Sequence, residues 1–219
     1  EIKKIVNYIN KIKPSIIIDF ASICMVNESW KFSNHYKNVN YFSKLKMTKY
    51  LEQKNLLKKY IYISTPGVFG SKKKIYEEDK IFKPTTPYAK SKMMAEKMFM
   101  ENYKKTNFPT IICRFSNFYG PGQPLYRLIP KLCIALDLNI KFPMQGMGSS
   151  KRNFIYAKDF SAGILSVIKR GKTGKTYHFS GNQILSIKDV IRKICHIKNK
   201  RFDNYVISTK DRKNKDSIY

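Results

Sequence analysis

Cysteine is scarce in this sequence of 219 residues. The four cysteines lie far apart and form no CxxC pair: Cys24, Cys113, Cys133 and Cys195. This spacing argues against a disulfide framework and indicates reduced thiols in a cytoplasmic protein. The three histidines are scattered too, and no cysteine or carboxylate lies at ligand spacing from them. We therefore expect no bound metal.

Long hydrophobic runs are also missing. The strongest, residues 16–18, is interrupted at once by Asp19, far below the length that a membrane span needs. Residues 1–4 lack the layout of a signal peptide. We expect no association with a membrane. The 42% of hydrophobic residues still suffice for a large core, which excludes wholesale disorder.

Negative charge is sparse, with 15 acidic residues against 43 basic ones and a formal net charge of +28. Only seven of the basic residues are arginine, and the lysines are scattered through every segment. A dedicated nucleic-acid surface usually gathers arginine or basic and aromatic residues on one element. We interpret the charge as compositional bias and expect no specific nucleic-acid partner, with a polyanion-binding module as a remaining alternative. Such a charge would still attract anionic substrates.

Hydrophobic periodicity predicts alternating helices and strands. We expect helices over residues 1–12, 39–54, 88–105, 128–136, 157–169 and 186–195. We expect strands over residues 15–20, 60–64, 110–115, 154–156 and 176–179. Strands that alternate with helices at this spacing are typical of an α/β fold with a parallel sheet.

The most informative segment is PYAKSK, which contains Tyr88 and Lys92. Residues four apart project from one face of a helix. An ammonium near a phenol lowers the phenol pKa, and this makes a base usable near neutral pH. Thr65 follows a predicted strand, at the edge where α/β sheets bind ligands. The alternative interpretation is a tyrosine packed under a surface helix and a solvated lysine.

Four motifs follow one another in order: STPGVFG from residue 64, PYAKSK from 87, RFSNFYGPGQ from 114 and KRNFIYAKD from 151. Over about residues 15–190 this order resembles the extended short-chain dehydrogenases/reductases that act on nucleotide sugars. Within them the sequence is most similar to the NAD-dependent epimerase/dehydratase family, in particular to its dTDP-glucose 4,6-dehydratase and sugar-nucleotide epimerase members.

The resemblance implies a partial Rossmann-like parallel sheet with a smaller α/β C-terminal substrate domain. Residues 1–120 would form the remainder of an NAD-binding domain. Residues 121–219 would form the substrate-binding region, with some segments returning to the first domain. The resemblance further implies NAD rather than NADP as cofactor, a nucleoside-diphosphate sugar as substrate, and a homodimer.

Residue roles also follow from the resemblance. Tyr88 would take a proton from the sugar C4 hydroxyl, Lys92 would lower the Tyr88 pKa and bind the cofactor ribose, and Thr65 would hydrogen-bond the reacting oxygen. The cofactor contacts are expected from Ala21, Ser22, Asn38, Ser64, Tyr88 and Lys92. The diphosphate contacts of the substrate are expected from Asn117, Arg127, Arg152 and Arg212.

Two departures from the family pattern bear on function. The sequence contains no GxxGxxG phosphate loop, so the pattern implies that the segment carrying it precedes the first residue. Pro66 and Gly67 stand where 4,6-dehydratases carry the Asp and Glu that eliminate water. Neither residue can act as acid or base, which favours oxidation and reduction alone, as in epimerases. A dehydratase or reductase of the same fold and a truncated, catalytically impaired module remain alternatives.

Overall fold

A computed structural model describes residues 2–72 and 74–211 of the chain. The contacts divide these residues into two compact units, which we describe one at a time. Of the described residues, the first unit takes in 2–70, 74–115 and 162–179, and the second takes in 71–72, 116–161 and 180–211. The division at residue 120 into a cofactor domain and a substrate region stays a prediction.

A four-stranded sheet forms the centre of the first unit. Its strands are β1 (Ile16–Asp19), β2 (Lys59–Ser64), β3 (Thr110–Phe115) and β7 (Thr176–Phe179). They lie in the order β1-β2-β3-β7, and every neighbouring pair is parallel. Each of these strands was predicted from its short apolar run, and the parallel α/β architecture is confirmed.

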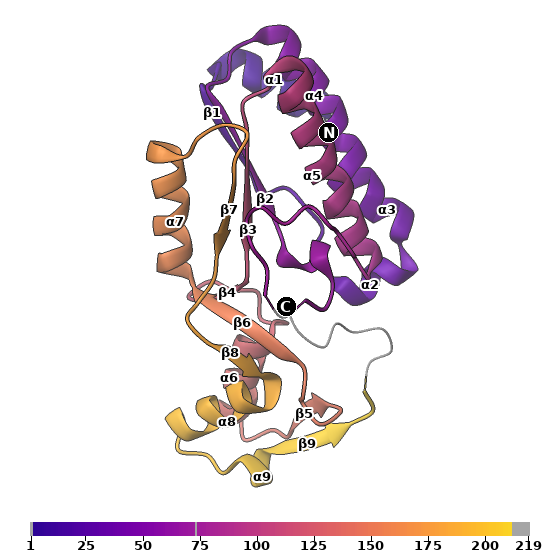
Figure 1. The fold of residues 1–219 in the computed structure, drawn as a ribbon. Helices are drawn as coiled ribbons and strands as arrows, with labels where there is room; N and C mark the ends of the chain where they lie inside the picture. The colour runs from indigo at the N-terminus through magenta and orange to yellow at the C-terminus, as the bar shows by residue number, and fades with distance from the viewer. Residues whose placement is uncertain (1, 73, 212–219) are drawn as a thin grey trace. The chain divides into compact units, whose positions relative to one another are not determined.

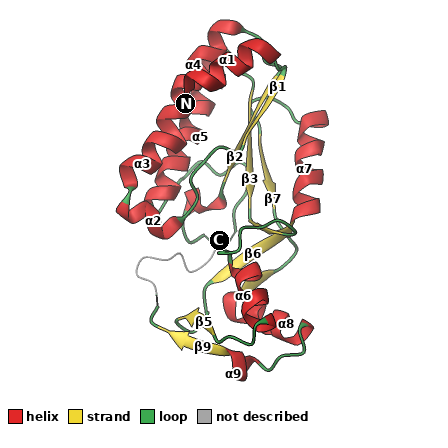
Figure 2. Ribbon diagram, turned by 180° about the vertical axis from the view of Figure 1, so that it is seen from behind, coloured by secondary structure: helices red, strands yellow, loops and turns green. Residues whose placement is uncertain are grey.

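Helices cover both faces of this sheet. Those of the first unit are α1 (Ile2–Ile12), α2 (Val26–Lys31), α3 (Ser33–Lys37), the π-helix η1 (Asn38–Phe42), α4 (Ser43–Lys54), the 3₁₀-helix η2 (Pro66–Phe69), α5 (Pro87–Thr106) and most of α7 (Ala157–Arg170). Figures 1 and 2 show α1, α4 and α5 on one face of the sheet and α7 on the other. Because both faces are covered, the strands consist of nearly continuous apolar residues.

The core under α4 and α5 is rich in aromatic residues. Tyr60 and Tyr62 alternate with isoleucines along β2, so both rings point to the same face. Their ring centroids lie 5.1 and 4.8 Å from that of Phe99 on α5. All three side chains are almost completely buried. This contact fixes α5 above the carboxyl half of β2.

Local capping sets the start and the end of α5. Thr86 is the N-cap, and its hydroxyl accepts a hydrogen bond from the Ala89 backbone N–H at 3.1 Å. Pro87 occupies the first turn, where its missing N–H is tolerated. Asn107 ends the helix with a left-handed φ of 55°. Tyr88 therefore lies in the first turn and Lys92 one turn later.

The segment before α4 differs from the prediction. The expected helix over residues 39–54 begins with the π-helix η1, and α2 and α3 precede it although neither was predicted. The π-helical turn was not predicted, because the spacing of hydrophobic residues does not distinguish a π-helix from an α-helix. The π-helix brings Asn40, a polar residue, into a fully buried position.

The second unit contains short strands and three helices. Its strands are β4 (Asn117–Tyr119), β5 (Phe142–Gln145), β6 (Lys151–Tyr156), β8 (Ile184–Ser186) and β9 (Val206–Thr209). Its helices are α6 (Leu128–Asp137), α8 (Ile187–Ile197) and α9 (Phe202–Tyr205), and it also holds the first residues of α7. The strands pair as β4-β6-β8 and β5-β9. Four of them, β4, β5, β8 and β9, were not predicted; each spans only three or four residues.

Strand β6 is longer than the predicted residues 154–156. Its first half, Lys151 to Asn153, pairs antiparallel with β8 and is polar. A polar half-strand leaves no apolar alternation in the sequence, which explains the short prediction. Among the described residues, no helix has the length and apolar character that crossing a membrane would demand.

Candidate active site

The predicted catalytic residues lie in segments of the first unit that follow β2 or pack against it. Thr65 follows the last residue of β2, and Tyr88 and Lys92 lie on one face of α5. The loop after β1 carries Ala21 and Ser22. This edge is where open parallel sheets bind ligands.

Thr65 is fixed by its own backbone turn. It is the N-cap of η2, and its Oγ1 accepts a hydrogen bond from the Gly67 N–H at 3.2 Å. A hydroxyl that accepts in this way still has its proton to donate. The Thr65 hydroxyl therefore keeps a proton that it can donate.

Tyr88 is half-buried and packs against a second tyrosine. Its ring meets that of Tyr36 edge-on, with centroids 6.4 Å apart and an interplanar angle of 83°. Tyr36 is 1% exposed, and its hydroxyl donates to the Met25 carbonyl at 2.6 Å. Helix α3 thus restrains the side of the Tyr88 ring.

Lys92 is a buried cation, with only 2% of its surface exposed. Its Nζ donates to the Ile63 carbonyl at 2.7 Å and lies 4.3 Å from the centroid of the Tyr62 ring. Burial lowers the pKa of Lys92 to about 8, and the Lys44 charge acts in the same direction while Asp19 opposes it. The ammonium is held in place but is easier to deprotonate than an ordinary lysine.

A buried carboxylate organises the end of β1. Asp19 accepts hydrogen bonds from Lys44 Nζ at 2.7 Å, from the Tyr60 hydroxyl at 2.6 Å and from the Ala21 N–H at 3.0 Å. Three donors compensate its desolvation. The network holds the turn that leads to Ala21 and Ser22. In the sequence, the only sign of this network was that Asp19 ends an apolar run.

Asn40 links that loop to the catalytic helix. Its side-chain amide exchanges hydrogen bonds with the N–H and carbonyl of Ile23, at 2.9 and 3.0 Å, and donates to Ser91 Oγ at 3.0 Å. Ser91 in turn donates to the Tyr88 carbonyl at 2.7 Å. Asn38, which the sequence singled out, is exposed at the start of η1. Sequence reasoning missed Asn40, because only the π-helix reveals which asparagine points inward.

The residues at this edge fit one end of NAD. Ser64 Oγ is buried and has no hydrogen-bond partner among the described residues, so it can accept one from a bound molecule. Lys92 holds its ammonium against the Ile63 carbonyl of β2, and Thr65 carries a hydroxyl just after the same strand. These groups suit the nicotinamide and its ribose. A pyrophosphate cradle of the GxxGxxG type is not part of this sequence.

A second buried ion pair supports α5 from below. Arg114 on β3 donates to Glu96 on α5, with Nη2 at 2.6 Å from Oε2 and Nε at 3.1 Å from both oxygens. Its Nη1 lies 2.9 Å from Nε2 of His178, which must accept this bond. Burial, followed by the Arg114 charge, lowers the pKa of His178 to about 4. The sequence carries one signal for this ion pair: Arg114 stands within an otherwise apolar strand, and a buried arginine needs an acidic partner.

The expected diphosphate ligands belong to the second unit. Asn117 opens β4, and its Nδ2 donates to the Asn153 carbonyl of β6 at 3.2 Å. Arg152 lies on β6, two residues before the partner of Asn117, and its Nη1 donates to the Lys151 carbonyl at 2.7 Å. Arg127 is the N-cap of α6 and stacks on Tyr126 at 5.4 Å. Arg212 lies outside the described residues.

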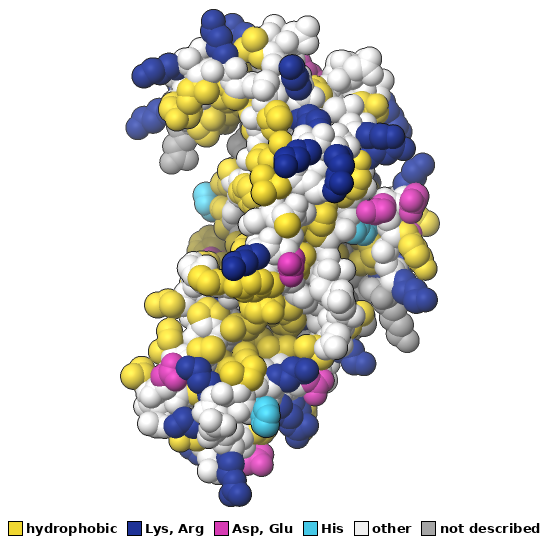
Figure 3. Space-filling model, turned by 90° about the vertical axis from the view of Figure 1, so that its left-hand side faces the viewer, with side chains coloured by type: hydrophobic (Ala, Val, Ile, Leu, Met, Phe, Trp, Pro, Cys, Tyr) yellow, Lys and Arg dark blue, Asp and Glu magenta, His cyan; other side chains and the backbone are white. Residues whose placement is uncertain are grey.

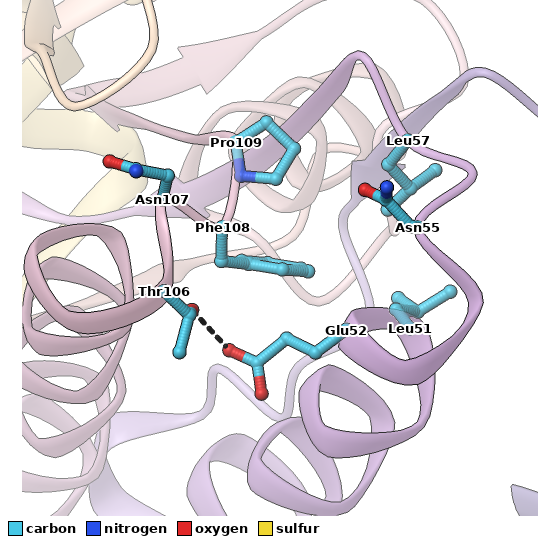
Figure 4. A pocket seen from close by; sticks show the side chains of 8 residues that line it. All are labelled: Leu51, Glu52, Asn55, Leu57, Thr106, Asn107, Phe108 and Pro109. Atoms are coloured by element: carbon cyan, nitrogen blue, oxygen red, sulfur yellow. Dashed lines mark hydrogen bonds between the residues drawn. The ribbon is translucent and has the colours of Figure 1, made fainter.

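A small cavity of about 100 Å³ lies elsewhere in the first unit, between the ends of α4 and α5. Figure 4 shows Glu52 and Thr106 joined by a hydrogen bond of 2.9 Å at its rim. It borders the amino ends of β2 and β3, opposite the edge that carries Thr65. We therefore do not assign it to the active site.

We also searched the described part of the chain for a metal site and for a basic surface. No group of three side chains there is placed to hold a metal ion. Figure 3 shows lysine and arginine side chains spread over the viewed face with hydrophobic ones between them.

Comparison with known proteins agrees with this geometry. The profile of the family described as GDP-mannose 4,6 dehydratase matches residues 1–218. The dTDP-D-glucose 4,6-dehydratase of Homo sapiens is 31% identical over 213 residues, which cover 94% of this chain and 61% of the human protein. The chain thus spans less than two thirds of that relative's length.

Solved structures share the fold. A dTDP-glucose 4,6-dehydratase from Streptomyces venezuelae, solved with NAD and TYD bound, superposes with a TM-score of 0.92 at 22% identity, covering 100% of this chain and 67% of that one. A UDP-glucuronic acid 4-epimerase from Bacillus cereus, in complex with UDP-glucuronic acid and NAD, gives 0.88 at 23% identity, covering 100% and 68%. With the profile match over nearly the whole chain, these likenesses show that the chain belongs to the GDP-mannose 4,6-dehydratase family of NAD-dependent epimerases and dehydratases.

Proposed function

We propose that this protein oxidises the C4 hydroxyl of a nucleoside-diphosphate sugar to a ketone and reduces it again, with NAD as cofactor. The observation that carries the proposal is the arrangement of Thr65, Tyr88 and Lys92 at the carboxyl edge of the parallel sheet. Membership of the family supplies the substrate class. The protein's activity and substrate are inferences, since the chain spans 61% of its human relative.

Each residue has a task in this chemistry. Tyr88, as a phenolate, takes the proton from the sugar C4 oxygen. Thr65 donates a hydrogen bond to the same oxygen, using the proton that its contact with Gly67 leaves available. Lys92, fixed by the Ile63 carbonyl, provides the positive charge that favours the phenolate. NAD, when bound, would accept hydride from C4 and return it.

The turn after β2 favours epimerisation over dehydration. Elimination of water from C5 and C6 needs an acid and a base near these carbons. The structure has Pro66 at the start of η2 and Gly67 buried behind it, so this turn supplies neither. We propose that the sugar keeps its oxygen at C6 and that the product is an epimer.

A dehydratase is the second candidate. Two names favour it. The human relative is a dTDP-D-glucose 4,6-dehydratase, and the matching family is described as GDP-mannose 4,6 dehydratase. In that case a carboxylate from another part of the protein would replace the residues missing after Thr65. A catalytically impaired module is a third candidate, since these residues contain no GxxGxxG loop of their own.

Cofactor, substrate contacts and assembly complete the proposal. NAD rather than NADP is supported by the NAD in both solved relatives described above. Asn117, Arg127, Arg152 and Arg212 are proposed to bind the diphosphate, which suits the net charge of +28. A homodimer and a cytoplasmic location are proposals that rest on the family resemblance and on the spacing of the cysteines.

One experiment separates these functions. The complete protein is incubated with NAD and, in turn, dTDP-glucose, UDP-glucose, UDP-glucuronic acid and GDP-mannose, and the products are analysed by chromatography and mass spectrometry. An epimer of unchanged mass supports the proposal. A product that has lost one water establishes the dehydratase. No product, together with no thermal stabilisation by NAD or by any sugar, supports the impaired module.

A further inference from the structure

The burial of Lys92 poses a physical problem. An ammonium with 2% of its surface exposed has lost nearly all its hydration, and a buried cation needs other partners to stay charged. The carbonyl of Ile63 accepts one of its three N–H bonds at 2.7 Å. Another partner must account for much of the remaining stabilisation.

The ring of Tyr62 lies in the right place to be that partner. Tyr62 is completely buried on β2, and the Lys92 Nζ lies 4.3 Å from its ring centroid. This is well within the distance at which the negative face of an aromatic ring attracts a cation. The contact is strongest where water is excluded from both groups, as it is here.

The hydroxyl of Tyr62 does not explain why a tyrosine ring is placed here. Among the described residues it has no hydrogen-bond partner, although it is buried. A buried hydroxyl without a partner is unfavourable. Burial and the nearby Asp19 charge raise the pKa of Tyr62 well above its usual value, so this phenol stays neutral. The part of Tyr62 that contacts the site is its ring.

We propose that Tyr62 is a positioning residue of the active site, whose ring face holds the buried Lys92 ammonium in its charged form at the end of β2. This inference deepens the proposed function and rests on it for its catalytic meaning.

Other charges around Lys92 have to be considered with the ring. Asp19 on β1 and Glu96 on α5 favour the ammonium, as does Cys24 in the loop after β1, while Lys44 on α4 opposes it. None of these groups changes when the ring alone is altered. A substitution at residue 62 that keeps the shape of the side chain, and so the burial of Lys92, therefore reports on the ring.

The test is a titration of the lysine side chains by NMR in the protein labelled with ¹³C and ¹⁵N lysine. Ordinary lysines titrate near pH 10.4, so one that titrates near pH 8 stands apart, and Lys92→Met identifies it. Tyr62→Phe keeps the ring and removes the hydroxyl. Tyr62→Leu removes the ring. A series of phenylalanines at position 62 with one to three fluorine atoms keeps the shape and weakens the negative face.

We expect Tyr62→Phe to leave the Lys92 midpoint in place and to raise the thermal unfolding temperature. Tyr62→Leu should lower the midpoint by about one pH unit, a tenfold change in proton affinity. The fluorinated series should lower it stepwise. The proposal is overturned if the fluorinated series leaves the midpoint unchanged, or if Tyr62→Phe lowers it as much as Tyr62→Leu. If Tyr62→Leu does not fold, the fluorinated series decides.

The catalytic meaning has its own readout. If the ring keeps Lys92 charged during turnover, Tyr62→Leu should shift the alkaline limb of the kcat profile to lower pH by the same amount as the NMR midpoint, with little change in KM. A merely structural role would reduce activity at every pH. The titration needs neither cofactor nor sugar, so a wild-type protein that shows it but turns over no nucleotide sugar refutes the proposed function and leaves the Tyr62 contact standing.

Discussion

Glu96 and Arg114 form a buried ion pair that joins the catalytic helix α5 to strand β3, with an Nη2–Oε2 distance of 2.6 Å. The guanidinium also lies over the ring of Phe69, 4.6 Å from its centroid. Glu96 is one turn beyond Lys92 on the same helix. The pair therefore fixes the height of Lys92 and Tyr88 above the sheet.

Glu96→Gln should destabilise the protein strongly. It leaves the Arg114 cation buried without its counter-charge, and breaking a buried pair in this way costs about 3–5 kcal/mol. Urea unfolding at pH 7 measures the loss. The matched control is Asp137→Asn, which breaks the exposed pair between Asp137 and Lys198. The control should leave the unfolding midpoint unchanged. If Glu96→Gln and Asp137→Asn lower the free energy of unfolding equally, the burial of the Glu96–Arg114 pair does not increase its contribution to stability.

His178 should make stability depend on pH. Its pKa is lowered to about 4 in the folded protein from 6.5, so between these pH values the unfolded chain binds a proton that the folded chain does not. Stability then falls as the pH drops from 6.5 to 4, by about 1–2 kcal/mol after allowance for solvent screening at this half-buried group. His178→Gln keeps an acceptor for Arg114 and should abolish this part of the decline. A variant as acid-sensitive as the wild type contradicts the assignment.

Lys92 should be unfavourable for stability and necessary for activity. Its folded pKa of about 8 lies below the unfolded value of 10.5, so the unfolded chain binds more protons between these values and stability rises with pH in this window. Below pH 8 the full penalty applies. Lys92→Met should therefore raise the free energy of unfolding at pH 7 by about 1–3 kcal/mol, because the lost bond to Ile63 offsets part of the gain. The advantage should vanish near pH 10, and a variant less stable than the wild type at pH 7 would refute this reasoning.

The two asparagines of η1 should behave differently. Asn40→Ala removes three hydrogen bonds from a fully buried site and should lower the free energy of unfolding by about 2–4 kcal/mol. Asn38→Ala, at an exposed position, should leave stability unchanged. If Asn38 contacts the cofactor, its variant will instead weaken NAD binding, which calorimetry measures. If Asn40→Ala lowers the free energy of unfolding no more than Asn38→Ala does, the hydrogen bonds of Asn40 do not contribute to stability.

The sequence predicted the four strands and the long helices of the first unit because most of these strands contain a short apolar run and the long helices have a clear period. Its assignment of Thr65, Tyr88 and Lys92 to one catalytic site stays a prediction. Asn40 and Tyr62 were not found. Their roles depend on a π-helical turn and on the approach of a side chain to a ring, and neither leaves a period in the sequence. In the second unit, short polar strands such as the first half of β6 have no apolar pattern to detect.

Tyr88 is proposed as the base for oxidation at the sugar C4 carbon. Turnover is compared for the wild type, Tyr88→Phe and the control Tyr8→Phe, which alters an exposed tyrosine on α1, in the complete protein with NAD and the nucleotide sugar that gives product. Tyr88→Phe should fold and unfold as the wild type does but lose turnover by about a hundredfold or more, while Tyr8→Phe retains it. Turnover by Tyr88→Phe at the wild-type rate would show that Tyr88 is not the base.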